Sequence, residues 1–240
     1  MPELPEWQPL DGATPPDLPD GPGGRVVAVL ATEAAAAAGW APTSALELAR
    51  GWAQSGARVI LVDGVLNRPA LHDAAAVPNR EGLTDAILHG GSLRRVAQPV
   101  GEDDVFVVTA GTPVADVGSV VRHDRWQRIT SAMTDADATL AMYLADGESG
   151  TAAFLGSATD IVVLAERGEE APRAIRDLEP LVRAVVGPGL GPRAGAGAGT
   201  PGVAPVLPEG DSGISQMILF LVAAIVIASV LGYMLVSGAG

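Results

Sequence analysis

Short runs of apolar, often β-branched residues recur along the chain, at residues 26–31, 59–62, 105–109, 139–144 and 161–165. Within each run the apolar character is nearly continuous and does not alternate with polar residues. A strand that is covered on both faces has this pattern, whereas a strand with one face in water alternates. The runs therefore predict strands that are buried inside a layered domain.

Stretches with a helical spacing of apolar residues separate these runs, at residues 43–54, 83–88, 117–133 and 171–185. Strands that alternate with helices through right-handed crossovers form a mainly parallel sheet with helices on both faces. The predicted fold class is therefore α/β. Such sheets bind ligands at the carboxyl ends of their strands, so function is expected in the loops after residues 31, 62, 109, 144 and 165.

The two ends of the chain differ from this core in composition. Residues 1–24 are rich in proline and acidic residues, and residues 186–213 are rich in glycine, proline and alanine. Neither segment has enough apolar content to offset the entropy of ordering. We expect a disordered tail over residues 1–24, a globular domain over residues 25–185 and a flexible linker over residues 186–213.

Residues 214–236 contain no charged residue. At about 1.5 Å per residue, a helix over this segment reaches roughly 35 Å, which spans the hydrocarbon core of a bilayer. A buried core helix is the alternative, but such helices rarely run this long without a charge. The first residues lack the apolar segment of a signal peptide. We expect a C-terminal transmembrane helix that anchors the chain in the inner (cytoplasmic) membrane, with the globular domain in the cytoplasm.

The composition excludes several kinds of chemistry. All 15 basic residues are arginines, and the sequence has no lysine and no cysteine. Schiff-base chemistry, a thiol nucleophile and a cysteine-based metal site are therefore ruled out. The three histidines are isolated, so no metal site is predicted. A net charge of −13 argues against a nucleic-acid partner, because nucleic-acid affinity depends on clustered positive charge.

The loop after the second predicted strand carries a long motif, whose members stand in the order Asp63, Leu66, Arg68, Pro69, Leu71, His72, Pro78, Asn79, Gly82, Leu83, Thr84 and Asp85. This segment resembles the bacterial tyrosine kinases of capsule and exopolysaccharide export and their MinD/ParA-type ATPase relatives. The resemblance implies a P-loop NTPase-like fold for residues 25–185. The family motif that it marks as retained consists of Asp63, Arg68, Pro69, His72, Gly82 and Asp85.

The family's nucleotide loop has no recognisable counterpart in this sequence. In the relatives, glycine amides wrap the phosphates, a lysine neutralises them and a hydroxyl holds Mg²⁺. Counting back from Asp63 without gaps places Ala38 and Trp40 at glycine positions, Ala41 at the lysine position and Pro42 at the hydroxyl position. A shift in register brings Thr43 or Ser44 to the hydroxyl position, but it supplies no lysine.

Two further carboxylates of the family are replaced by Val65 and Met142. The remaining acid, Asp63, is interpreted as a cap of the turn after its strand in preference to a catalytic residue. Without loop amides, lysine and metal-binding acids, the site loses the electrostatic stabilisation on which phosphoryl transfer depends. We expect a pseudoenzyme that uses no cofactor and in which nucleotide binding is weak or absent.

Three functions remain open on the sequence alone. The first is a membrane-anchored, catalytically inactive kinase-like or ATPase-like scaffold or adaptor in exopolysaccharide or capsule biosynthesis or export. The second is an accessory subunit of an unrelated integral membrane complex. The third is a regulatory ATPase that binds ATP in an unorthodox site. The expected partners are the lipid bilayer and a membrane protein.

Overall fold

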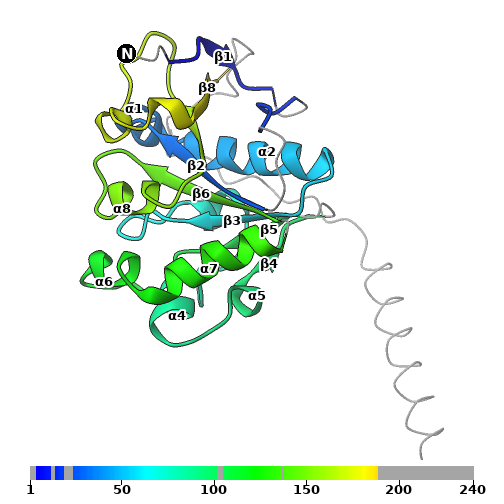
Figure 1. The fold of residues 1–240 in the computed structure, drawn as a ribbon, viewed down its shortest axis with the longest axis vertical. Helices are drawn as coiled ribbons and strands as arrows, with labels where there is room; N and C mark the ends of the chain where they lie inside the picture. Colours follow the sequence, from blue (N-terminus) through cyan, green and yellow to red (C-terminus); the bar gives the residue numbers. More distant parts are fainter. Residues whose placement is uncertain (1–3, 12–13, 19–23, 102–104, 137, 189–240) are drawn as a thin grey trace, which may run out of the picture. The chain divides into compact units, whose positions relative to one another are not determined.

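The computed structural model describes residues 4–11, 14–18, 24–101, 105–136 and 138–188, all within one compact unit. These residues build an eight-stranded sheet in the order β1-β8-β7-β2-β6-β3-β5-β4 (Figure 1). The strands are β1 (Trp7–Pro9), β2 (Arg25–Ala31), β3 (Val59–Asp63), β4 (Gln98–Pro99), β5 (Val105–Val108), β6 (Thr139–Ala145), β7 (Asp160–Leu164) and β8 (Val182–Gly187). Neighbouring strands are parallel except for β4, which pairs antiparallel with β5.

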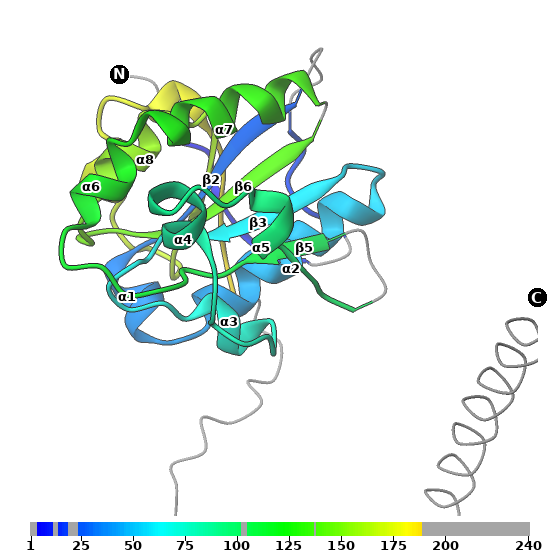
Figure 2. The same ribbon diagram turned by 90° about the horizontal axis from the view of Figure 1, so that it is seen from below.

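Helices cover both faces of this sheet (Figures 1 and 2). One face packs against α1 (Glu33–Ala37), α2 (Ala41–Gln54) and α3 (Leu71–Ala74). The other packs against α4 (Leu83–Leu88), α5 (Leu93–Val96), α6 (Val117–Val121), α7 (Asp124–Asp135) and α8 (Thr151–Leu155). Each face has its own apolar cluster, and the central strands contribute alternate side chains to both. The predicted mainly parallel α/β sheet is confirmed.

All five predicted apolar runs form strands, namely β2, β3, β5, β6 and β7. Their ends differ from the predicted ones by at most one residue. Nearly every residue in them is buried, as the continuous apolar pattern indicated. The continuous apolar runs therefore correctly indicated strands that are buried on both faces of the sheet.

The helix predicted over residues 117–133 is in fact two helices, α6 and α7. His123 has an extended backbone (φ −72°, ψ 132°) and its Nδ1 accepts a hydrogen bond from the Arg125 N–H at 3.2 Å, so it caps α7. The break directs Trp126 onto Phe154, where the two rings meet edge to face with centroids 5.0 Å apart. Helical spacing of apolar residues continues across this turn, and spacing alone does not reveal the cap.

The helix predicted over residues 171–185 does not form. Two short 3-10 turns, η1 (Arg173–Ile175) and η2 (Glu179–Leu181), are followed directly by β8. Pro180 has no N–H to donate, which interrupts a helical hydrogen-bond pattern. From Val182 onward buried and half-buried residues alternate, and this is the pattern of a strand.

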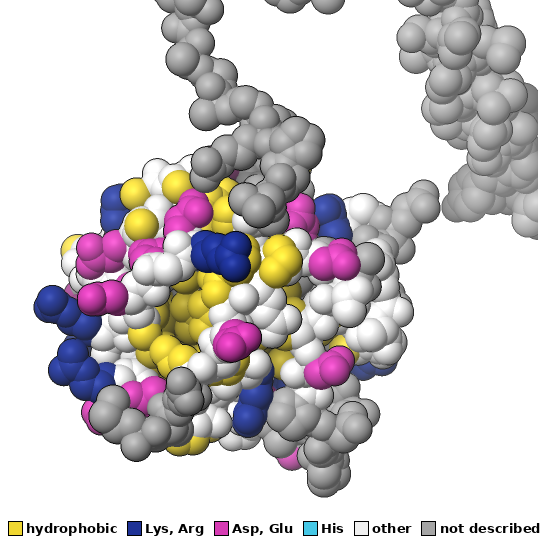
Figure 3. Space-filling model, turned by 90° about the horizontal axis from the view of Figure 1, so that it is seen from above, with side chains coloured by type: hydrophobic (Ala, Val, Ile, Leu, Met, Phe, Trp, Pro, Cys, Tyr) yellow, Lys and Arg dark blue, Asp and Glu magenta, His cyan; other side chains and the backbone are white. Residues whose placement is uncertain are grey.

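Part of the N-terminal tail is ordered, contrary to prediction. β1 pairs in parallel with β8, and the Trp7 indole donates to the Ala165 carbonyl at 2.9 Å. The Trp52 indole holds Pro16 through its carbonyl at 3.0 Å. On this side of the sheet, apolar side chains gather in a recessed area with acidic and arginine side chains around it (Figure 3). A sheet edge offers unpaired backbone groups, so even a segment with few apolar residues becomes ordered against it.

The domain therefore exceeds the predicted range of residues 25–185 at both ends, because β1 precedes it and β8 runs to Gly187. The remainder of the predicted linker, from residue 189 on, and the predicted span at residues 214–236 lie outside the described residues. Within the part of the chain that the structure describes, no helix has the length and apolar composition needed to cross a bilayer.

Candidate functional site

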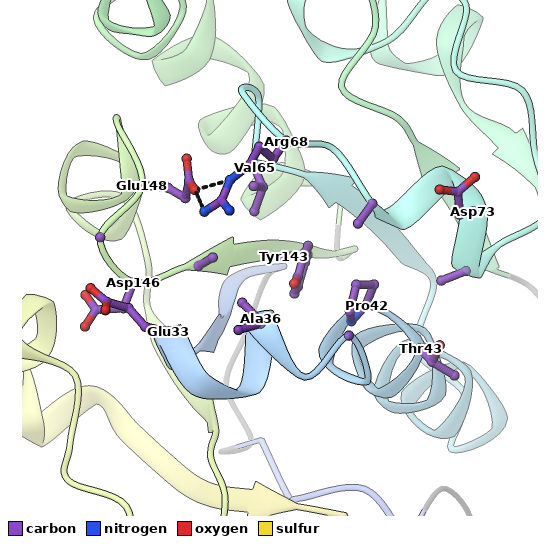
Figure 4. Close-up of a pocket in the computed structure, with 16 residues that line it drawn as sticks. Glu33, Ala36, Pro42, Thr43, Val65, Arg68, Asp73, Tyr143, Asp146 and Glu148 are labelled. Carbon is purple, nitrogen blue, oxygen red and sulfur yellow. Dashed lines mark hydrogen bonds and ion pairs between the residues drawn. The ribbon is translucent and has the colours of Figure 1, made fainter. Parts of the chain in front are cut away.

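A hollow of about 830 Å³ opens where the carboxyl ends of β2, β3 and β6 meet (Figure 4). Its wall is formed by α1, the first turn of α2 and the loops that follow β3 and β6. Parallel α/β sheets bind their ligands at this position. The hollow is therefore the candidate functional site.

The segment after β2, where the resemblance implies a nucleotide loop, is wound into α1. Thr32 caps this helix, since its Oγ1 accepts from the Ala35 N–H at 3.1 Å. The N–H groups of Ala36, Ala38 and Gly39 donate to carbonyls within the same segment at 2.9 to 3.1 Å. A phosphate-binding loop needs such N–H groups free and converging on the ligand. In this segment the N–H groups of Ala35, Ala36, Ala38 and Gly39 already have acceptors within the chain.

The predicted loop residues lie in and around the entrance to α2. Ala38 is exposed at the end of α1, while Ala41 and Pro42 are buried in the first turn of α2. Thr43 is exposed and lines the hollow. Trp40, which position counting placed at a glycine of the loop, is not among the described residues that line the hollow. Its indole donates to Glu166 Oε1 at 3.1 Å instead.

The charges that line the hollow are mainly negative. Among the described residues, four acidic side chains line it, those of Glu33, Asp73, Asp146 and Glu148, against one base, Arg68. Arg68 lies at the mouth and donates to Glu148 Oε1 through Nε at 2.9 Å and through Nη2 (Figure 4). One acid is thereby neutralised, and the remaining field repels a polyanion such as a triphosphate.

Asp63 at the end of β3 is fully buried and its carboxylate holds the following loop in shape. Oδ1 accepts from the Val65 N–H at 3.1 Å, and Oδ2 accepts from the N–H groups of Ala70 and Leu71 at 3.2 and 3.0 Å. Burial raises the pKa of Asp63 to about 6, against the lowering effect of these hydrogen bonds. These contacts agree with the interpretation of Asp63 as a turn cap.

Tyr143 is a site residue that the sequence did not single out. It belongs to β6, is 3% exposed, and lines the hollow opposite α1 and α2. Burial raises its pKa, and the nearby charge of Asp63 adds to the effect. Its neighbour Met142 packs in the apolar cluster on the opposite face. The sequence could have indicated this position, because successive side chains of a strand point to opposite faces and Tyr143 therefore lies on the face opposite Met142.

The other residues of the retained motif that follow β3 lie beside the hollow or behind its wall. Arg68 lines the mouth, and Pro69, which is half-buried, leads the chain from it into α3. His72 in α3 is near Asp73, with 3.4 Å between Nε2 and Oδ1, and its Nδ1 is buried without a hydrogen bond. Of these three residues, Arg68 alone faces the hollow.

Gly82 and Asp85 form a separate structure at the end of β5. Asp85 Oδ2 accepts from the backbone N–H groups of Gly82 and Thr112 at 2.9 and 3.0 Å, and Oδ1 accepts from the Thr112 hydroxyl at 2.7 Å. Burial acts to raise the pKa of Asp85, but these hydrogen bonds outweigh it and lower the pKa. The pair fastens the start of α4 to the loop after β5. Neither residue lines the hollow.

Among the described residues, no three histidine, aspartate or glutamate side chains are grouped so as to hold a metal ion. The acids around the hollow come from α1, α3 and the loop after β6, and Asp73 lies on the opposite side from Glu33 and Asp146 (Figure 4). The arrangement offers dispersed negative charge around an apolar floor and no chelating cluster.

The described residues form a mainly parallel α/β domain with a hollow at the carboxyl ends of its central strands. The kinase domain of Escherichia coli tyrosine kinase ETK is similar in fold, with a TM-score of 0.60 and 19% identity over 73% of this chain and 71% of that one. The chimerical protein CapA2B2 has a TM-score of 0.59 and 16% identity over 71% of this chain and 77% of that one. The BceF tyrosine kinase domain has a TM-score of 0.54 and 17% identity, covering 70% and 69%.

In sequence, the chain is similar to tyrosine-protein kinase YwqD of Bacillus subtilis (strain 168), with 31% identity over 86 residues. That match covers 36% of this chain and 36% of the kinase, so the chain spans about a third of its relative. No family model matches. The predicted resemblance to the bacterial tyrosine kinase superfamily is confirmed.

Replacing Gly82 with alanine should destabilise the domain strongly. A Cβ at this position would lie 2.1 Å from the Thr109 carbonyl oxygen and 2.5 Å from the Gly111 nitrogen. We expect Gly82→Ala to lower the free energy of unfolding by about 2 kcal/mol or more, measured by urea unfolding with tryptophan fluorescence. Gly156→Ala is the matched control, since a Cβ there meets nothing closer than 3.3 Å and φ is −61°. Equal effects of the two changes would contradict this assignment.

Stability should depend on pH through Asp63. The pKa of the Asp63 carboxyl group is about 6 in the folded chain and 3.8 in the unfolded chain. The folded state therefore binds the carboxyl proton more tightly than the unfolded state does. Its contribution is therefore complete below pH 3.8 and is lost as pH rises through 6, by about 3 kcal/mol in total. Subtracting the unfolding free energies of Asp63→Asn from those of the native chain, between pH 4 and 8, isolates this slope. The exposed Asp135→Asn is the control, and parallel curves for the native chain and Asp63→Asn would refute the effect.

Proposed function

We propose that this chain is a catalytically inactive, kinase-like scaffold that is anchored in the inner membrane by residues 214–236. Its globular domain, in the cytoplasm, docks onto a membrane protein that takes part in exopolysaccharide or capsule biosynthesis or export. The observation that carries the proposed loss of activity is the winding of this segment into α1, where the N–H groups of Ala35, Ala36 and Ala38 are already hydrogen-bonded.

Three further features support inactivity. Ala41, at the lysine position, is 0% exposed, and no lysine exists elsewhere in the sequence to replace it. The hollow carries an excess of carboxylates where a triphosphate needs positive charge. Val65 lines the hollow at a position where the family has an acid that contributes to metal binding. Each change removes a separate part of the phosphoryl-transfer machinery.

The scaffold role is supported by what the chain keeps. Asp63 and Asp85 each accept several hydrogen bonds that shape the loops at the carboxyl edge of the sheet. Their contacts maintain a folded surface without contributing to a reaction. The link to polysaccharide export rests on the resemblance to the export kinases, and the membrane location rests on the uncharged segment at residues 214–236.

The chain should neither bind Mg·ATP tightly nor hydrolyse it. Isothermal titration of the full chain in detergent should give no heat of binding at micromolar nucleotide, and phosphate release should stay at background. The E. coli ETK kinase domain serves as positive control for the assay. Ala41→Lys should not create hydrolysis, because α1 still occupies the loop.

Ala41 is buried, so a lysine there risks unfolding the domain. Thr43→Lys adds the ammonium group at an exposed position of the same hollow, and it should likewise give no turnover. Micromolar Mg·ATP affinity of the native chain, or turnover by either variant, would favour the regulatory ATPase instead.

Removing residues 214–236 should release the chain from membranes into the soluble fraction. Exchanging the segment for an unrelated apolar span of the same length should keep the chain in the membrane fraction. Because the sequence has no cysteine, Gln54→Cys at an exposed position of α2 reports the orientation: an impermeant maleimide should label it only after lysis. A truncated chain that stays with membranes, or labelling of intact cells, would overturn the proposed location.

A further inference from the structure

The lining of the hollow suits a ligand whose charge is opposite to that of a nucleotide. Glu33 and Asp146 are not paired with a basic side chain among the described residues, whereas Glu148 is paired with Arg68. Figure 4 shows these two unpaired acids together at one end of the hollow. Unpaired carboxylates around a concave, partly apolar surface concentrate cations there.

The floor of the hollow contains a polar group without a partner. Tyr143 is 3% exposed, and its hydroxyl makes no hydrogen bond with any described residue. The hydroxyl oxygen is not among the described buried atoms that lack a partner, so it opens into the hollow. In Figure 4 the Tyr143 ring stands in the middle of the hollow, between Val65, Ala36 and Pro42. This hydroxyl is therefore placed to interact with a ligand.

The apolar part of the lining fixes the shape of such a ligand. Ala36 and Ala37 of α1, Pro42 of α2, and Val65 contribute aliphatic surface to the lining of the hollow. Arginine and lysine side chains pack their aliphatic stems on apolar surface while the charged end reaches a polar partner. The volume of about 830 Å³ exceeds that of one side chain and lies in the range of ordinary ligand sites.

We propose that this hollow is a docking site for a basic segment of a partner protein, one of whose arginine or lysine side chains reaches Glu33 and Asp146. This inference rests on the proposed scaffold function, because a site that does not serve a nucleotide is free to serve a partner. The stem of the side chain packs on Ala36 and Pro42, and the Tyr143 hydroxyl accepts a hydrogen bond from the segment. Charge complementarity selects this occupant, and the same field excludes acidic segments.

The probe is a short fluorescent peptide in which arginine alternates with glycine, compared with the same peptide carrying glutamine. Anisotropy titration of the full chain in detergent should show binding of the arginine peptide and at least tenfold weaker binding of the glutamine peptide. Glu33→Gln combined with Asp146→Asn should weaken binding at least tenfold. Tyr143→Phe, which keeps the ring, should weaken it by about three- to tenfold.

Because the whole chain is acidic, a control of equal charge is needed. Asp135→Asn combined with Asp177→Asn removes two exposed charges outside the hollow and should change affinity less than twofold. If both double variants weaken binding equally, the peptide is attracted only by the overall negative charge of the chain, and the proposed site is wrong. Tighter binding of spermidine than of the peptide would overturn the protein partner in favour of a small polyamine. Thermal melting of each variant verifies that it is folded.

The outcome is separable from that of the proposed function. If Mg·ATP binds with micromolar affinity and displaces the peptide, the scaffold proposal fails together with the docking site. If neither Mg·ATP nor the peptide binds, the docking site alone fails and the loss of nucleotide binding stands.

Discussion

A backbone N–H in a tight turn donates to one acceptor at a time, and the character of this site depends on how the N–H groups after β2 are used. In α1 the N–H groups of Ala35, Ala36 and Ala38 bond to Thr32 and to carbonyls one turn earlier. A loop that wraps phosphate leaves the same groups pointing at the ligand. The run of alanines favours the helix, since alanine has the highest helix propensity and lacks the conformational freedom of glycine. The choice between helix and phosphate cradle is thus made locally, by residue type.

In the proposed scaffold a helix stands in place of the phosphate-binding loop, so the charges of the other residues around the hollow need not suit a bound phosphate. A site that holds a triphosphate does not tolerate uncompensated carboxylates, because like charges repel strongly where water is partly excluded. In the proposed scaffold no phosphate is held, so carboxylates such as those of Glu33 and Asp146 are tolerated on the rim. The retained motif persists under a different constraint. Asp63 and Asp85 each satisfy N–H groups that would otherwise be buried without acceptors, and such a loss is costly whether or not the site is catalytic.

The sequence predicted the central strands well and the peripheral elements poorly, for identifiable reasons. β2, β3, β5, β6 and β7 are buried on both faces, so their apolar runs are read directly. β1 is held by its pairing with the edge strand β8 and by the hydrogen bond of Trp7 to the Ala165 carbonyl. A proline-rich sequence gives no sign of such tertiary contacts. The break between α6 and α7 depends on one histidine cap. Position counting placed a nucleotide loop around Ala41, but it did not reveal that α1 forms in this segment or that Tyr143 faces the hollow.

In the proposed function, the membrane anchor makes it possible for a weak docking contact to be populated. A single basic side chain in a half-open, partly hydrated site gains modest free energy, because exposed ion pairs are screened and flexible side chains lose entropy on binding. Such a contact is too weak to assemble two freely diffusing proteins. Attachment of both partners to one membrane raises their local concentration, so that a weak contact is populated. A scaffold with a half-open acidic hollow therefore fits a tethered chain, and the same hollow on a freely diffusing chain would need a much larger apolar interface around it.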